Sequence, residues 1–231
     1  MKALVLSGDG INCERETAQA LRDVGFAPKI IPISDGPERA RLDRFALVAL
    51  PGGFSFGDDL GSGRVLALRI RRELKWDLAA YARAGGMAIG ICNGFQALLR
   101  LGAFGAEVSI THNVSRKFLN TWVTLAVDPA AERGSPWLRG IQDLELPIRH
   151  GEGRVVYQKP PRVALRYEGD PNGSQDRIAG LVDETGRILG LMPHPEAGAD
   201  DVLHPWFFEG RGRADGRRLF ENAWKELNHD R

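Results

Sequence analysis

The chain has 231 residues, of which 43% are hydrophobic and 26% are charged, so it has enough apolar material for a sizeable buried core. Its 31 Lys and Arg residues against 30 Asp and Glu residues leave no basic excess, which argues against nucleic-acid binding. Two cysteines make no disulfide framework or zinc-spaced cluster, and no run has the length of a membrane span or the pattern of a signal peptide, so we expect a cytoplasmic protein without a membrane partner.

The first hundred residues alternate short apolar runs with helical patterns. Such alternation predicts a parallel sheet covered by helices on both faces. The run at 87–91 is almost wholly apolar, as expected for a strand buried on both faces. The expected strands are 3–6, 29–33, 47–50 and 87–91, and the expected helices are 14–24 and 63–84.

Beyond Gly102 the pattern changes to strand-like runs separated by turns rich in Gly, Pro and Asp, which favours antiparallel pairing. A final helix is expected at 216–228, and no repeat or linker divides the chain, so residues 1–231 are predicted to form one domain. The fold class is therefore α/β, with a single open, mostly parallel sheet flanked by helices and additional antiparallel strands in the second half. These later strands are expected at 121–127, 144–148, 154–158, 163–167, 178–182 and 188–192.

The strand at 87–91 leads into a Gly-x-Cys-x-Gly motif centred on Cys92 and followed by a helical pattern. Gly90 and Gly94 permit the sharp strand-to-helix turn that lifts a nucleophile clear of a sheet. The helix start directs N–H groups and a positive dipole end at the sulfur, which lowers the pKa of a thiol. An isolated cytosolic cysteine is usually structural, but this turn favours Cys92 as a nucleophile, whereas Cys13 keeps a structural interpretation although it could line the same sheet edge.

A thiolate nucleophile needs a proton shuttle, and among five histidines His194 has the most suggestive surroundings. It follows the strand expected at 188–192 and lies in the rigid tetrapeptide Pro-His-Pro-Glu at 193–196. Glu196 is placed to accept the second imidazole N–H and to hold the tautomer. The tetrapeptide alone could be a stiff loop, but pairing with Cys92 at the ligand-binding edge of an α/β sheet favours catalysis.

A third motif leaves the strand at 47–50 with the sequence Pro-Gly-Gly-Phe-Ser-Phe-Gly-Asp. A Gly-Gly loop can turn backbone N–H groups towards a developing oxyanion, and we assign that role to Gly53 and Phe54. The simpler alternative is a flexible turn. A phosphate-binding loop is excluded, because no Gly-Lys-Ser/Thr follows.

These three motifs, in this order and spacing, resemble the class I (triad) glutamine amidotransferases over nearly the whole chain. Within that superfamily the resemblance is to the glutaminase subunits of phosphoribosylformylglycinamidine synthase. The segments at 113–118, 150–154 and 171–174 with 178–180 support this finer match, because relatives serving other pathways are expected to lack them. The other supporting segments are 53–58 and 92–96.

The resemblance implies hydrolysis of glutamine to glutamate and ammonia through Cys92, His194 and Glu196. It further implies transfer of the ammonia to an ATP-dependent synthetase subunit, which makes the amidine of formylglycinamide ribonucleotide, with a small accessory subunit as a third partner. No cofactor is expected on this chain, since ATP and Mg belong to the synthetase. The residues that the resemblance places around glutamine are Gly52, Gln96, His150, Gly151 and Glu152.

Some positions depart from the family pattern: Phe56 replaces the usual Tyr, Ala197 the usual Arg, and residues 58–64 differ from the common Asp-Tyr-Leu-Arg run. Alternatives are a glutaminase subunit of another pathway, a γ-glutamyl hydrolase on the same fold, or an inactive regulatory subunit. The aromatic segment at 204–208 either packs internally or meets a partner, and packing is the favoured expectation.

Overall fold

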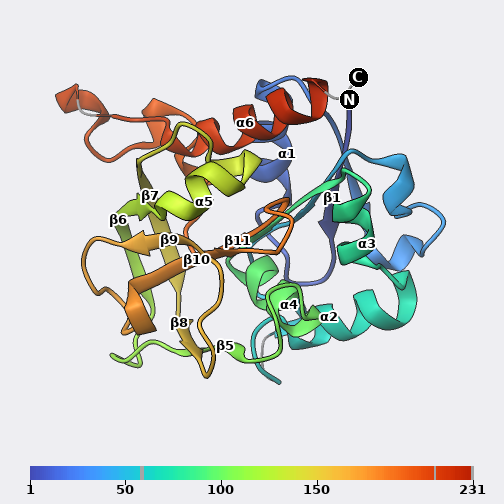
Figure 1. Cartoon of the computed structure of the whole chain (residues 1–231), viewed down its shortest axis with the longest axis horizontal. Coiled ribbons are helices and arrows are strands. Elements are labelled where there is room, and N and C mark those ends of the chain that lie inside the picture. Colours follow the sequence, from blue (N-terminus) through green and yellow to red (C-terminus); the bar gives the residue numbers. More distant parts are fainter. Residues whose placement is uncertain (58–59, 211, 230–231) are drawn as a thin grey trace.

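The computed structural model describes residues 1–57, 60–210 and 212–229. Within these residues nine strands form one sheet, flanked by helices on both faces (Figure 1). The sheet order is β2 (Ala27–Pro32), β1 (Lys2–Ser7), β3 (Leu47–Leu50), β4 (Met87–Ile91), β11 (Ile188–Leu191), β10 (Ile178–Val182), β9 (Val163–Tyr167), β6 (Leu119–Val127) and β7 (Asp143–His150). A separate antiparallel ribbon pairs β5 (Val108–His112) with β8 (Glu152–Tyr157).

The first five strands of that order pair in parallel, and the other four are joined to them and to one another by antiparallel pairing. The predicted α/β fold with antiparallel strands in the second half is thereby confirmed. The strand expected at 154–158 is β8, but it belongs to the ribbon and not to the main sheet.

Helices cover the parallel part of the sheet on both sides because its strands are apolar on both faces. Along β1, Ala3 and Val5 pack with the side chains of one face, whereas Leu4 and Leu6 pack with those of the other. The first face is covered by α1 and α6, and the second mainly by α2, α3 and part of α4. The helices are α1 (Glu14–Asp23), α2 (Arg64–Arg69), α3 (Leu78–Arg83), α4 (Asn93–Leu101), α5 (Pro129–Gly134) and α6 (Asp215–His229).

The long helix expected at 63–84 is wrong, because the chain breaks it after a π-helical turn at Ile70–Leu74. Lys75 adopts a left-handed conformation with φ 53°, and Asp77 then begins α3 by accepting a hydrogen bond from the Ala80 N–H at 2.8 Å. The indole N–H of Trp76 donates to the carbonyl of Ala40 at 2.8 Å, which fixes the break. A tertiary contact therefore interrupts a periodicity that continues through it.

Strands that are distant in the sheet order meet at the carboxyl edge. β7 is the fourth strand beyond β11, yet the N–H of His194, just after β11, donates to Pro147 O in β7 at 2.8 Å. The thiol of Cys92, just after β4, lies 3.6 Å from Arg149 O, also in β7. The sheet must therefore curl until β7 reaches the carboxyl ends of β4 and β11.

The aromatic segment at 204–208 packs internally only in part. His204 is buried, with its ring 4.5 Å from that of Trp122 and its Nε2 3.3 Å from the Glu145 carboxylate. Phe208 is 96% exposed and Trp206 is 45% exposed, so the expectation that the whole segment packs internally is wrong.

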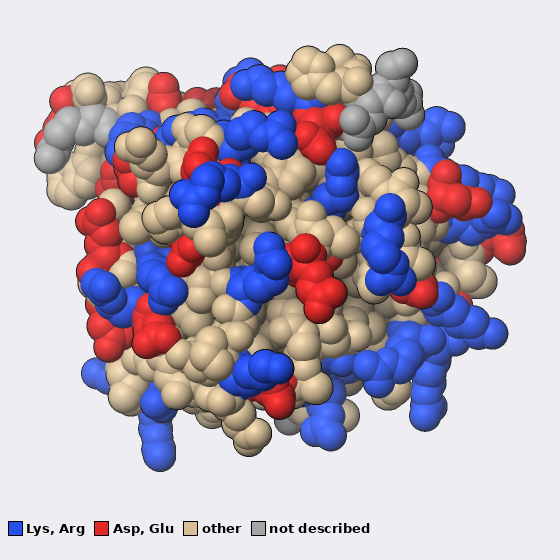
Figure 2. Space-filling view, viewed as in Figure 1, with Lys and Arg blue, Asp and Glu red and all other residues tan. Residues whose placement is uncertain are grey.

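The surface shows acidic and basic side chains interspersed over one face of the molecule (Figure 2). This distribution agrees with the near balance of charges in the sequence. Among the helices that the structure describes, none has both the length and the apolar character needed to cross a membrane.

Candidate active site

The turn between β4 and α4 carries Cys92 in a strained conformation, with φ 50° and ψ −106°. A Cβ atom on Gly94 would collide with the carbonyl oxygen of Leu50, and one on Gly90 would lie 2.8 Å from the carbonyl oxygen of Gly94. Only glycine fits at either position, as the sequence predicts. The Cys92 side chain consequently stands at the carboxyl edge of the sheet, where it is 95% buried.

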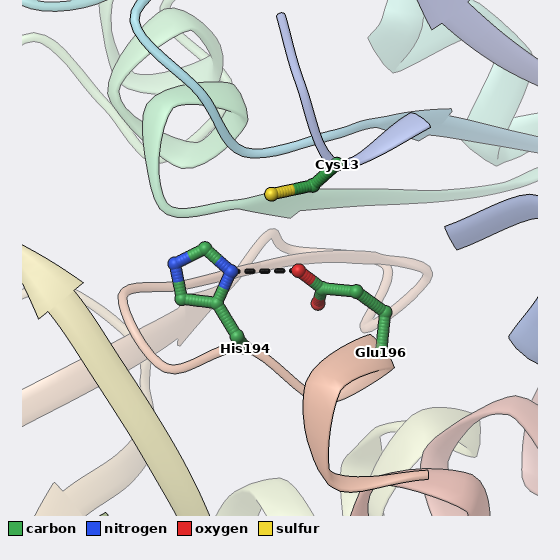
Figure 3. A group of neighbouring side chains, drawn as sticks. All are labelled: Cys13, His194 and Glu196. Carbon is green, nitrogen blue, oxygen red and sulfur yellow. Dashed lines mark hydrogen bonds and ion pairs between the residues drawn. The ribbon is translucent and has the colours of Figure 1, made fainter. Parts of the chain in front are cut away.

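His194 and Glu196 form a buried pair in the loop after β11, as Figure 3 shows. The distance between His194 Nδ1 and Glu196 Oε1 is 2.6 Å, and their side chains are only 4% and 1% exposed. Gly198 donates to the Pro195 carbonyl in the short 3₁₀ turn that begins at Glu196. The contact expected from the Pro-His-Pro-Glu motif is therefore present, and it holds the imidazole in one orientation.

The electrostatic surroundings of His194 favour its charged form. Burial alone lowers the pKa of this imidazole, but the Glu196 carboxylate and the Cys92 sulfur outweigh burial and hold the pKa above its ordinary value. The charged His194 ring thus lies between a carboxylate and a thiol. This arrangement suits a proton relay that serves a thiolate nucleophile.

The pKa of His150, at the end of β7, is shifted in the opposite direction. Burial and, to a smaller extent, the nearby His194 charge lower its pKa to about 4. Its Nδ1 lies 3.0 Å from Asn113 Oδ1, and the Asn113 amide donates to the His150 carbonyl at 2.8 Å. His150 is therefore a neutral, buried ring that helps to fix the start of the loop at 150–152.

The Gly-Gly loop after β3 only partly fits its expected role. The N–H of Phe54 donates to Gly10 O at 2.8 Å, so the assignment of Phe54 to an oxyanion hole does not fit this arrangement. The N–H of Gly53 makes no hydrogen bond to a described residue and stays available. Gly52 has a packing role, because a Cβ there would lie 2.7 Å from His194 Cε1. Asp58 and Asp59, at the start of the run that differs from the family pattern, lie outside the described residues.

Asn93 is a site residue that the sequence interpretation missed. Its side chain is buried, accepts a hydrogen bond from the Ser55 N–H at 3.2 Å and donates to Gln96 Oε1 at 3.0 Å. It thereby connects the Gly-Gly loop to α4 directly beside Cys92. A polar residue that begins a largely apolar helix is the signal that could have found it.

Gln96 and Glu152 lie together, as the resemblance implies. The Gln96 side-chain amide donates to the Glu152 carbonyl at 2.6 Å. Both residues line a cavity of about 680 Å³ with arginines from α2 and α4, Arg64 and Arg100 among them. Gly151 has open space around its Cα. Glu152, at the end of the loop at 150–152, therefore borders a space large enough for a small substrate.

The three segments singled out by the resemblance converge beside this loop. Asn113 Oδ1 accepts from the Gly153 N–H at 3.2 Å, and the Asn172 side chain donates to Gly153 O at 2.8 Å. The Val114 N–H donates to Asn172 O at 3.1 Å. Residues from 113–118, 150–154 and 171–174 thus form one hydrogen-bonded network.

Comparison with known proteins bears on both fold and chemistry. A model of the CobB/CobQ-like glutamine amidotransferase domain matches residues 1–225. The chain is 38% identical to phosphoribosylformylglycinamidine synthase subunit PurQ of Dehalococcoides mccartyi, over 97% of each chain, and 36% identical to that of Thermotoga maritima, over 98% of each. A chain of the Thermotoga maritima PurLQS structure superposes with a TM-score of 0.82 at 35% identity, over 98% of both chains.

Proposed function

The chain belongs to the CobB/CobQ-like glutamine amidotransferase family, and we propose that it is the glutaminase subunit of phosphoribosylformylglycinamidine synthase. It hydrolyses glutamine to glutamate and ammonia. The observation that carries the chemistry is the Cys92 turn beside the buried His194–Glu196 pair. The names of the relatives, which the chain matches over nearly their whole length, indicate the pathway. The hydrogen-bonded network around Asn113 supports that assignment.

In the proposed reaction, the Cys92 thiolate attacks the side-chain amide carbon of glutamine while His194 holds the thiol proton. The carbonyl oxygen becomes an oxyanion, for which the N–H group of Gly53 is the proposed donor. Collapse of this intermediate breaks the C–N bond, and His194 gives its proton to the departing ammonia. Glu196 keeps the imidazole oriented throughout.

A thioester between Cys92 and the glutamyl group remains. Water attacks it with His194 as general base, which forms glutamate and returns the proton to sulfur. We place the head group of the substrate against Gln96 and Glu152, at the cavity that both line. Gly151, next to Glu152 in the chain, has open space around it, while His150 and Gly52 act by shaping the loops.

The partners of this reaction are an ATP-dependent synthetase subunit and a small accessory subunit, as the PurLQS structure of the similar Thermotoga maritima chain suggests. The ammonia passes to the synthetase, which uses ATP and Mg to convert formylglycinamide ribonucleotide into its amidine. This chain itself needs no cofactor for glutamine hydrolysis. The proposed compartment is the cytoplasm.

Reconstitution with the synthetase and accessory subunits tests the proposal. We expect Cys92→Ala to abolish amidine formation from glutamine while formation from added ammonia continues. Normal glutaminase turnover by Cys92→Ala would contradict the mechanism. Hydrolysis of γ-glutamyl peptides without any partner would instead favour a γ-glutamyl hydrolase, and loss of both glutamine- and ammonia-dependent synthesis would contradict a role limited to ammonia supply.

A further inference from the structure

Cys13 approaches the His194–Glu196 pair from a different strand. It follows β1, and its N–H donates to Gly52 O at 3.3 Å, which brings the start of α1 against the Gly-Gly loop. Figure 3 shows its sulfur directed at the histidine and the glutamate. The Cys13 sulfur, one imidazole nitrogen and one Glu196 oxygen all lie within 4.8 Å of one another.

Two polar atoms of this group have no hydrogen-bond partner among the described residues. They are His194 Nε2 and Glu196 Oε2, and both belong to side chains that are more than nine-tenths buried. Nε2 lies on the side of the ring away from Glu196, and the second Glu196 oxygen points away from the ring, so these two atoms do not face one shared ligand. The atoms nearest the Cys13 sulfur are His194 Nδ1 and the carboxylate oxygen bonded to it (Figure 3). A cation held there would replace the hydrogen bond between them, and the carboxylate oxygen that has no partner could join as a second oxygen ligand.

We propose that Cys13, His194 and Glu196 form a binding site for a thiophilic divalent cation such as Zn²⁺, and that the bound cation inhibits the enzyme. The inhibitory part rests on the proposed function, whereas cation binding does not. Sulfur, imidazole nitrogen and carboxylate oxygen are the donors that Zn²⁺ takes in proteins, at about 2.0 to 2.3 Å each. Ligand atoms within 4.8 Å need only a modest approach to share one cation.

The inhibition follows because His194 would be a ligand of the cation and is also the proposed catalytic base. A neutral imidazole whose Nδ1 donates its lone pair to a cation carries its hydrogen on Nε2, so Nε2 cannot accept a proton from a thiol or from water. Glu196, drawn towards the cation, would no longer orient the imidazole. Cys92, which lies beside His194, would then lack the base that takes its proton.

The site is tested on the full chain, freed of metal by a chelator, by titration with Co²⁺ and competition with Zn²⁺. We expect one equivalent of Co²⁺ with a thiolate-to-cobalt absorption band. Cys13→Ser should weaken Zn²⁺ binding by roughly 100-fold, the scale expected when a metal site loses an essential contact. Circular dichroism checks that the variant is folded, and Cys13→Ala serves as a second variant.

The matching activity assay follows glutaminase turnover in the reconstituted complex as Zn²⁺ is added. With the turnover of each protein referred to its own value without Zn²⁺, Cys13→Ser should need roughly 100-fold more Zn²⁺ than wild type for half-inhibition. Equal Zn²⁺ affinity in wild type and both variants, or a Co²⁺ complex without a thiolate band, would overturn the site. A chain that binds Co²⁺ through Cys13 but hydrolyses no glutamine would leave the site standing and would contradict only the proposed function.

Discussion

His150 and His194 lie close together in the site but hold protons very differently. Burial lowers the pKa of His150 to about 4, whereas the Glu196 carboxylate and the Cys92 sulfur overcome burial at His194 and raise its pKa. One ring is therefore kept neutral near physiological pH while the other is kept ready to carry a proton. This difference gives two predictions with opposite dependence on pH.

His150 should make the protein less stable in mild acid. Its pKa is lower in the folded state than in the unfolded state, so the unfolded chain binds the proton more readily between pH 6.5 and about 4. Stability is then lost as pH falls through this window, by at most on the order of 3 kcal/mol. In His150→Gln, urea unfolding should show a flatter pH dependence there. Substitution of the exposed His229 by Gln is the control, and equal slopes in His150→Gln and wild type would contradict the prediction.

Glu196→Gln should preserve the shape of the pair while removing its charge. We expect kcat/KM for glutamine to fall by roughly 100-fold or more, because the imidazole loses its orienting carboxylate. The raised pKa of His194 stabilises the fold below its ordinary value of about 6.5, and this contribution is lost as pH rises through the raised pKa. The difference in unfolding free energy between wild type and variant should therefore be largest near pH 6 and shrink in alkali. A constant difference would argue against the charged pair.

Single residues were predictable where the local sequence itself restricts the backbone. The glycines around Cys92 and the prolines around His194 predict the turns at these two residues. Phe54 was not predictable, because its N–H is taken by Gly10, a residue after another strand. Cys13 was given a structural interpretation from its own neighbours; they indicated that it could line the same sheet edge, but not that its sulfur approaches His194.

At the scale of the element, the β4–Cys92–α4 turn depends on how closely the helix start approaches β3. Gly94→Ala should place a methyl group against the Leu50 carbonyl, and the neighbouring backbone cannot move without disturbing the buried sheet. We expect a loss of about 3 kcal/mol in unfolding free energy, together with reduced glutaminase turnover.

Gly169→Ala is the matched control for this substitution. A methyl group at Gly169 meets no atom within 4 Å, and its backbone is not left-handed, so the change should stay within about 0.5 kcal/mol. Both values come from chemical denaturation under the same conditions. Equal stability of the two variants would show that the close approach of α4 to β3 is not needed.

Elements were predictable when periodicity and flanking residues agreed. The apolar run of β4 met both conditions. The helix expected at 63–84 failed because its apolar spacing continues across the break, while the contact that enforces the break, from Trp76 to Ala40, lies far away in sequence. The strand β5 has a short, half-exposed pattern and forms only against β8.

At the scale of the whole molecule, the site depends on the curl of the sheet. The pattern of strands predicts their existence and the parallel first half, but not that β7 returns to the carboxyl edge beside Cys92 and His194. The convergence of 113–118, 150–154 and 171–174 is likewise a product of the complete fold. The resemblance identified these segments without indicating that they touch.

Asn113 is the point at which this long-range assembly can be tested. Its buried amide contacts the Lys117 carbonyl, the Gly153 N–H, and both the carbonyl and the ring of His150. Asn113→Ala leaves several of these groups unsatisfied, so we expect a loss of about 2 to 4 kcal/mol in unfolding free energy. Asn120→Ala, at an exposed position of β6, is the control and should cost less than about 0.5 kcal/mol.

The same substitution should affect glutamine binding more than the chemical step. Asn113 fixes the loop at 150–152 but does not reach the His194–Glu196 pair, whose hydrogen bond is made within one tight turn. A loosened loop should therefore raise KM for glutamine by about 10-fold, an energy of roughly 1.4 kcal/mol, with a smaller change in kcat. Steady-state kinetics of the reconstituted complex, at a temperature where the variant is folded, separates the two constants. A fall in kcat at unchanged KM would instead mean that the network acts on the catalytic residues themselves, through β7 and its contacts with Cys92 and His194.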